Sequence, residues 1–216
     1  MRDAPSAQPS MAPPRPRATT TESPEPRQAT RRAPSETSAP PSPASDATAS
    51  AVSRLLPLPD GHVFAYATAD EVTGTRGMFV TRVRRGPAGR VTLTTGARAR
   101  SLVVRPDGVA RDPGGAYLLR APLTAGASWA GDDGARVTVR DADARVTVPA
   151  GSFVGCVVTV EERGGDAPRR TTTTFCPDVG IAALEVEAGA GAELAHETAR
   201  LQSFGPAVDL GAGPPR

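Results

Sequence analysis

From Leu55 onward, the chain is a succession of short apolar and β-branched runs, in which polar residues alternate with apolar ones and turn residues intervene. Such alternation is typical of half-buried strands, and turns such as Pro106-Asp107-Gly108 suit tight reversals between antiparallel strands. We therefore predict an all-β fold: a single domain of antiparallel, strongly curved sheet, arranged as a meander, a sandwich or an open barrel. The predicted strands are His62–Thr68, Arg76–Arg84, Arg90–Thr95, Arg100–Arg105, Ala116–Arg120, Arg136–Arg140, Arg145–Val148, Gly155–Glu162, Arg169–Cys176, Ile181–Glu187 and Glu193–Ser203.

One stretch of this domain, Ala192–Leu201, has an Ala, Glu and Leu content that would also suit a helix. We favour a strand there, because it continues the meander. The tail after Gly205 is rich in Gly and Pro, which favours a frayed end.

Residues 1–52 differ in composition and are dominated by Pro, Ala, Ser, Thr and Arg. Steps such as Pro13-Pro14-Arg15-Pro16 remove amide donors and disfavour helix at the preceding residue. Nothing in the segment repeats at a strand or helix period, so it cannot bury enough apolar surface to offset its ordering entropy. We predict a disordered tail or stalk over 1–52, an all-β domain over 53–205 and a frayed C-terminal tail over 206–216.

The charge balance limits the classes of partner. The 25 basic and 23 acidic residues leave a net charge of +2, so no strong single-sign field points to nucleic acid. Every basic residue apart from two histidines is Arg, and neither Lys nor Asn occurs, which favours a GC-rich bacterial genome.

No apolar run is long enough to span a bilayer. Met1 leads directly into Arg2 and Asp3, and no export signal is visible there. The protein is therefore expected to be cytosolic, unless this sequence starts downstream of its export signal.

The two cysteines flank a turn-rich stretch and lie at equal distances from Asp166, since 156 + 176 = 2 × 166. A hairpin centred there would place Cys156 directly opposite Cys176, Val158 opposite Thr174 and Val160 opposite Thr172. We favour a structural disulfide in this register. Two reduced, buried cysteines or a catalytic thiol remain as alternatives, although no Cys-x-x-Cys occurs and the spacing does not suit zinc.

Two motifs surround these cysteines. The first runs Val146-Thr147-Val148-Pro149-Ala150-Gly151-Ser152-Phe153 toward Cys156, and the second is Phe175-Cys176-Pro177-Asp178-Val179-Gly180. With the opening Leu56-Pro57-Leu58-Pro59-Asp60-Gly61, they resemble a family of bacterial exported β-rich domains of unknown function, often lipoproteins. The resemblance covers roughly Leu55 to Phe204 and departs from the family pattern at Ser152 and Asp178. It implies a curved antiparallel sheet in an envelope protein and transfers no catalytic residue.

The motif residues have structural roles in this interpretation. Pro149 and Gly151 form a bend between strands, Phe153 anchors the following strand in the core, and Pro177 to Gly180 turn the chain after the hairpin. The chain also carries an internal echo, Pro57-Leu58-x-x-Gly61 and Pro122-Leu123-x-x-Gly126, which is consistent with a duplicated β unit or with chance.

Catalytic chemistry finds little support. Gly151-Ser152-Phe153-Val154-Gly155 is not a nucleophile elbow, and the two histidines, His62 and His196, are interpreted as solvated. Acidic pairs in predicted turns, Asp132-Asp133 and Asp141-x-Asp143, would offer oxygen ligands to Ca²⁺, but aspartate is common in turns without metal. Glu161-Glu162 and Glu185-x-Glu187 are interpreted as solvated strand faces or edge charges. We predict no catalytic residue, no metal site and no cofactor.

The function that we predict is a non-enzymatic binding or structural role in the bacterial cell envelope, for an exported or surface-tethered domain. A curved sheet can shelter an apolar ligand or a lipid chain on its concave face, or bind an envelope protein. The alternatives are a hydrolase that uses His62 or His196 with a nearby Asp, and an assembly or spacer subunit that pairs through sheet edges. The strand residues expected to line either a filled core or a cavity are Phe79, Val91, Leu93, Leu102, Val104, Leu118, Val137, Val139, Val158 and Val160.

Overall fold

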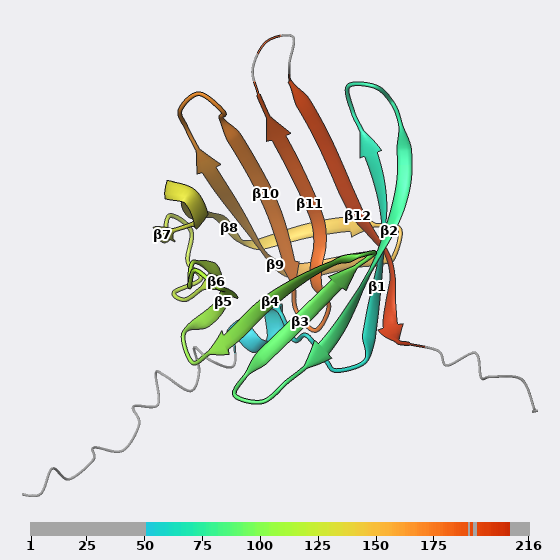
Figure 1. Ribbon diagram of the computed structural model, residues 1–216, viewed down its shortest axis with the longest axis vertical. Helices are drawn as coiled ribbons and strands as arrows, with labels where there is room; N and C mark the ends of the chain where they lie inside the picture. The colour runs from blue at the N-terminus through green and yellow to red at the C-terminus, as the bar shows by residue number, and fades with distance from the viewer. Residues whose placement is uncertain (1–50, 190, 192–193, 208–216) are drawn as a thin grey trace, which may run out of the picture. The chain divides into compact units, whose positions relative to one another are not determined.

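The computed structural model describes residues 51–189, 191 and 194–207, so almost all of the tail predicted over 1–52 lies outside the described residues. Within that range, the fold is all-β, as predicted (Figure 1). Its strands are β1 (His62–Asp70), β2 (Arg76–Arg85), β3 (Arg90–Thr95), β4 (Arg98–Arg105), β5 (Gly108–Asp112), β6 (Tyr117–Arg120), β7 (Ser128–Ala130), β8 (Arg136–Val148), β9 (Gly151–Arg163), β10 (Arg169–Cys176), β11 (Gly180–Ala188) and β12 (Ala195–Pro206). A short 3-10 helix, η1 (Asp132–Gly134), precedes β8.

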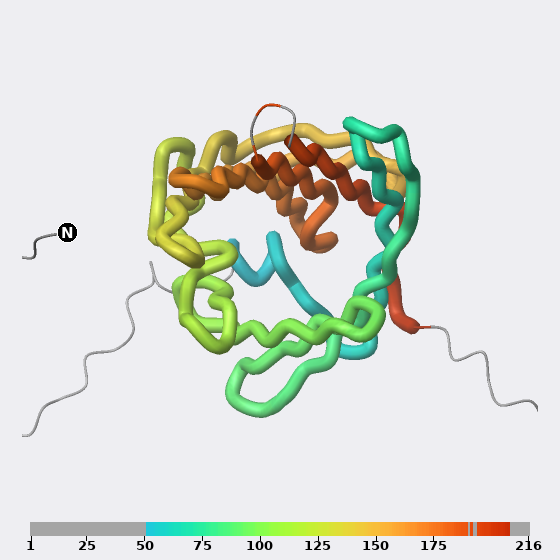
Figure 2. Tube along the Cα trace, turned by 45° about the horizontal axis from the view of Figure 1, so that its top comes forward, coloured from blue at the N-terminus to red at the C-terminus, as the bar shows by residue number. Residues whose placement is uncertain are grey.

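All twelve strands belong to one sheet, with the order β6-β5-β4-β3-β2-β1-β12-β11-β10-β9-β8-β7. Every neighbouring pair is antiparallel, and β1 pairs with β12, which joins the first half of the meander to the second. The sheet curls until its two edge strands, β6 and β7, approach each other without backbone pairing (Figure 2). The interior of this nearly closed sheet contains the core.

The segment before β1 occupies one end of the curled sheet. Residues 51–55 are helical, and the chain from there to residue 60 lies inside the ring of strands in Figure 2. Val52, Leu55, Leu56 and Leu58 are all buried there. The composition did not predict this short helix, because its few apolar residues follow directly on a Pro- and Ser-rich stretch.

Two strands, β5 and β7, were absent from the sequence prediction. β5 is only five residues long and carries Arg111 and Asp112, whereas β7 has three residues. The segment Asp141 to Asp143 was expected to be a turn between two strands, and that expectation was wrong. It lies instead within the continuous strand β8, where repeated register shifts against β9 accommodate the polar residues.

The predicted β9–β10 hairpin is confirmed, including its register. Val158 pairs with Thr174 and Val160 with Thr172. Cys156 and Cys176 form a disulfide, with their Cα atoms 4.2 Å apart, and both residues are fully buried. The segment from residue 195 is strand β12, as favoured over a helix.

Candidate functional site: an apolar cavity inside the sheet

The concave side of the sheet encloses a cavity of about 330 Å³. Its walls come from both halves of the meander, because curling brings β1 to β4 opposite β11 and β12. Of the strand residues expected to line a core or a cavity, Phe79, Leu93, Leu102 and Leu118 line the cavity. Val91, Val137, Val139, Val158 and Val160 are buried outside its lining, and Val104 is partly buried against the core. The interior is therefore filled in one part and open in another.

Tyr66 and Phe79 form a rigid part of the wall. They are paired across β1 and β2, and their rings stack with centroids 5.0 Å apart. The Tyr66 hydroxyl donates a hydrogen bond of 3.0 Å to the carbonyl oxygen of Ile181 on β11. Burial raises the pKa of this phenol far above its usual range, so Tyr66 stays neutral and keeps its donor. The bond ties β1 to β11, the strand on the far side of its neighbour β12.

The floor of the cavity is made by the segment before β1 and the turn before β11. Leu56, Leu58 and Val179 line it, together with Gly180. Gly180 has φ of +101°, a backbone conformation that favours glycine. The Asp178 amide donates a 2.7 Å hydrogen bond to the Arg54 carbonyl, which ties the turn to the segment.

Arg85 holds the same floor segment from the other side. Its Nε and Nη2 atoms donate hydrogen bonds of 2.9 Å to the carbonyl oxygens of Leu58 and Pro57, respectively. Because Arg85 is the last residue of β2, it anchors the floor to the sheet. The segment before β1 is thus bonded both to the end of β2 and to the turn before β11.

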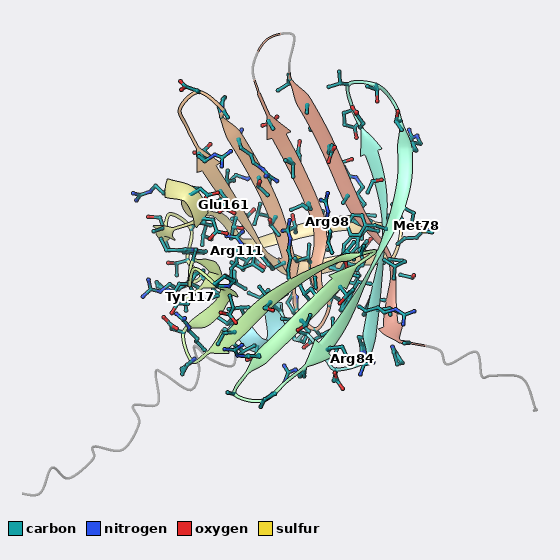
Figure 3. All side chains as sticks on the ribbon, in the orientation of Figure 1. Met78, Arg84, Arg98, Arg111, Tyr117 and Glu161 are labelled. Atoms are coloured by element: carbon teal, nitrogen blue, oxygen red, sulfur yellow. A yellow bond between two sulfur atoms is a disulfide. The ribbon has the colours of Figure 1, made fainter. Side chains whose placement is uncertain are left out.

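The opposite end of the cavity is polar. Thr81 and Thr95 share a 2.7 Å hydroxyl hydrogen bond there, and both line the cavity. Arg98 pairs with Thr95 and Arg100 with Leu93, so the two arginines project from the same face of the sheet as those lining residues. Both arginines line the cavity while remaining exposed to solvent. Figure 3 shows Arg98 projecting from the start of β4 toward β11 and β12.

An ion pair crosses the interior near the open seam between β6 and β7. Arg111 on β5 binds Glu161 on β9 with two contacts of 3.2 and 2.9 Å, and its Nη1 lies 3.1 Å from Asp132 (Figure 3). Trp129 Nε1 donates a 3.0 Å bond to the Tyr117 carbonyl, which links β7 to β6. Glu161 was expected to lie on a solvated face, and that expectation was wrong. Its side chain is only 20% exposed and joins strands that share no backbone pairing.

The predicted structural residues lie around the disulfide. Pro149 is exposed in the turn before β9, and Gly151 begins that strand with φ of +142°. Phe153 is partly buried and packs against the core. Pro177 is in the turn after β10, and a side chain at Gly155 would lie 3.8 Å from it.

The two histidines lie in different settings. The ring of His62 lies 3.4 Å from the Asp60 carbonyl oxygen, and His196 Nε2 lies 2.8 Å from Glu185 Oε1. Among the described residues, neither histidine has a hydrogen bond to a serine or an aspartate side chain.

The acidic residues occupy two different settings. Glu185, Glu187 and His196 form a half-buried group whose ligand atoms lie within 4.8 Å of one another. Glu187 also lies 3.9 Å from Arg170, and the side chains of Glu185 and Glu187 are 46% and 42% exposed, so the two glutamates have both solvent and charged neighbours. Asp132, Asp133, Asp141 and Asp143 do not form such a group within the described part of the chain.

The fold and the cavity together define a class: a β domain of one curled antiparallel sheet with an apolar pocket inside it. The structure is similar to a protein from Bacteroides fragilis described as "a putative exported protein with YmcC-like fold", with a TM-score of 0.41 and 13% identity over 68% of this chain and 96% of that one. It is also similar to "a putative lipoprotein" from Parabacteroides distasonis, with a TM-score of 0.41 and 14% identity over 70% and 98% of the two chains.

Likenesses at this level do not bear on activity. No protein-family model matches the chain, and no curated protein matches it. Among the described residues, no helix has the length and apolar character needed to cross a bilayer.

Proposed function

We propose that this protein is an exported, non-enzymatic binding domain that holds an apolar ligand within its curled sheet. The observation that carries the proposal is the cavity of about 330 Å³ between the two halves of the meander. Protein interiors normally close-pack, so an opening of this size in a domain of modest core is unusual. Its volume falls within the roughly 300–1,000 Å³ that is typical of small-molecule sites.

The construction of the cavity supports a preformed site. Tyr66 is held by a stacked ring and by a hydrogen bond to β11, and the floor is bonded to the framework through Arg85. A site that is already ordered loses little conformational entropy when a ligand binds. The apolar side chains that line it favour an apolar ligand, since burying its surface there removes that surface from water.

Two observations support export to an oxidising compartment. Cys156 and Cys176 form a disulfide, and disulfides persist mainly outside the reducing cytosol. The motifs around these cysteines also resemble those of bacterial exported domains. A role in assembly through sheet edges has less support, because the edge strands β6 and β7 have only four and three residues.

The proposal is tested by titrating the full chain with the apolar fluorophore N-phenylnaphthylamine. Saturable binding at one site per chain is expected for the wild type. Leu93→Trp places a bulky indole ring in the cavity. It should weaken binding by about tenfold or more, because the ring occupies volume that the probe needs.

The matched control is Thr94→Trp, one residue along β3, where the side chain projects from the other face of the sheet. This variant should bind the probe like the wild type. Circular dichroism tests whether both variants are folded. Equal binding by both folded variants, or no saturable binding by the wild type, would overturn the proposal.

A further inference from the structure

The mouth of the cavity carries positive charge that the fold itself does not use. Arg98 and Arg100 line the cavity on the same face of β4, next to Thr95 and Leu93. Within the described ranges, neither arginine has a carboxylate within ion-pair distance or a hydrogen bond to another residue. Both guanidinium groups are exposed, so they keep their charge in solvent at the edge of an apolar space.

Other arginines near this interior are engaged. Arg111 binds Glu161 and Asp132, and Arg85 binds two backbone carbonyls. Glu161, a carboxylate on β9 outside the cavity lining, is already paired with Arg111. The two arginines on β4 are thus the cationic groups of the cavity lining, and no acidic residue belongs to that lining.

We propose that the ligand is an anionic amphiphile, whose apolar chain lies against the cavity walls while its carboxylate or phosphate head is bound by Arg98 and Arg100. The inference rests on the proposed apolar-ligand function and adds the class of head group. An apolar chain would extend toward the floor at Leu58, and the head would remain at the polar mouth beside Thr81 and Thr95. Planar guanidinium groups suit this role, because they form paired hydrogen bonds with carboxylate and phosphate oxygens.

The charge arrangement also predicts which molecules are excluded. A neutral chain of the same length gains the apolar contacts but forms no charge-assisted hydrogen bond at the mouth. A cationic chain meets two like charges there and should bind more weakly still. The head-group preference is a separate quantity from the apolar affinity, so the two parts of the proposal can be measured independently.

The test compares dodecanoate, dodecanol and dodecyltrimethylammonium, each displacing N-phenylnaphthylamine from the full chain, with the two ionic ligands kept below their micellar concentrations and dodecanol below its solubility limit. Dodecanoate should bind about tenfold more tightly than dodecanol. In Arg98→Gln/Arg100→Gln, dodecanoate should lose that advantage while dodecanol binds as before. Added salt should weaken dodecanoate binding to the wild type, and leave dodecanol binding unchanged.

The matched control is Arg82→Gln/Arg84→Gln, which removes the same charge from the outer face of β2, where Arg84 lies in Figure 3. It should retain the preference for dodecanoate. Equal affinities for dodecanoate and dodecanol in the wild type would overturn the head-group assignment and leave the apolar site intact. A loss of the preference for dodecanoate in both double variants would also overturn it, since net charge alone would then explain the effect. Failure of all three ligands to bind the folded chain would overturn both proposals.

The source of the head group is resolved by a second measurement. Phosphatidylglycerol vesicles present an anionic phosphodiester in a bilayer, and dodecyl phosphate presents an anionic phosphomonoester on a single chain. Displacement of the probe by dodecyl phosphate, lost in Arg98→Gln/Arg100→Gln, supports binding within the cavity. Sedimentation with vesicles but no displacement by dodecyl phosphate would overturn the cavity assignment in favour of a surface contact.

Discussion

Reducing the Cys156–Cys176 bond should remove a large part of the domain's stability. The bond closes a loop with a sequence separation of 20 residues. In the chain-entropy model, a crosslink of this size restricts the unfolded chain by about 3 kcal/mol. Since domains are commonly stable by only about 5–15 kcal/mol, the loss would be a substantial fraction of the total.

The assay is urea unfolding of the oxidised and reduced wild-type chain, followed by circular dichroism. The comparison breaks one covalent bond and changes no residue of the sequence. Cys156→Ala/Cys176→Ala, measured under both conditions, shows whether the reductant has any other effect. A shift of about 6–12 °C in Tm should accompany the change in the free energy of unfolding. A loss below about 1 kcal/mol would refute the loop-entropy reasoning.

Two further predictions concern the contacts that hold the cavity in shape. Arg111→Met should lower the free energy of unfolding by about 1–3 kcal/mol, because it leaves the carboxylate of Glu161 without its partner inside the sheet. The double variant Arg111→Met/Glu161→Leu should recover most of that loss, and additive losses in urea unfolding would contradict this account. Arg85→Ala should release the floor segment, so amide hydrogen exchange at Leu56 and Leu58 should accelerate while exchange in β9 and β10 stays unchanged. Equal acceleration in both regions would indicate global destabilisation instead.

Local patterns in the sequence were sufficient to predict much of the fold. The hairpin register followed from residues close in the chain: two cysteines equidistant from Asp166, with Val158 and Val160 facing Thr174 and Thr172. Two of the predicted strands, Arg90–Thr95 and Arg169–Cys176, have the bounds that we predicted. β5 could not be recognised, because its short sequence combines glycine, arginine and aspartate with few apolar residues.

The site depends on contacts that no local pattern contains. Arg111 and Glu161 are 50 residues apart, and they meet only because the sheet curls until β5 faces β9. The alternation of Leu93 with Thr92 and Thr94 indicates a buried side chain, but it cannot tell a filled core from a cavity. Likewise, Arg98 and Arg100 resemble ordinary exposed strand charges until the register places them beside Thr95 and Leu93. The inward direction of Arg98 and Arg100 could have been inferred from Leu102, which has the same parity along the strand and therefore lies on the same face.

The most direct test of the ligand cavity uses the single isoleucine of the chain, Ile181, which lies in its wall. Selective ¹³C labelling of isoleucine and methionine methyl groups gives one probe inside the cavity and another at Met78, which is 65% exposed on the outer side of β2 (Figure 3). On titration with dodecanoate, the Ile181 methyl signal should shift and saturate while the Met78 signal stays in place. A saturable shift at Met78 with no change at Ile181 would contradict the account, because the chain would then bind the ligand on its outer surface.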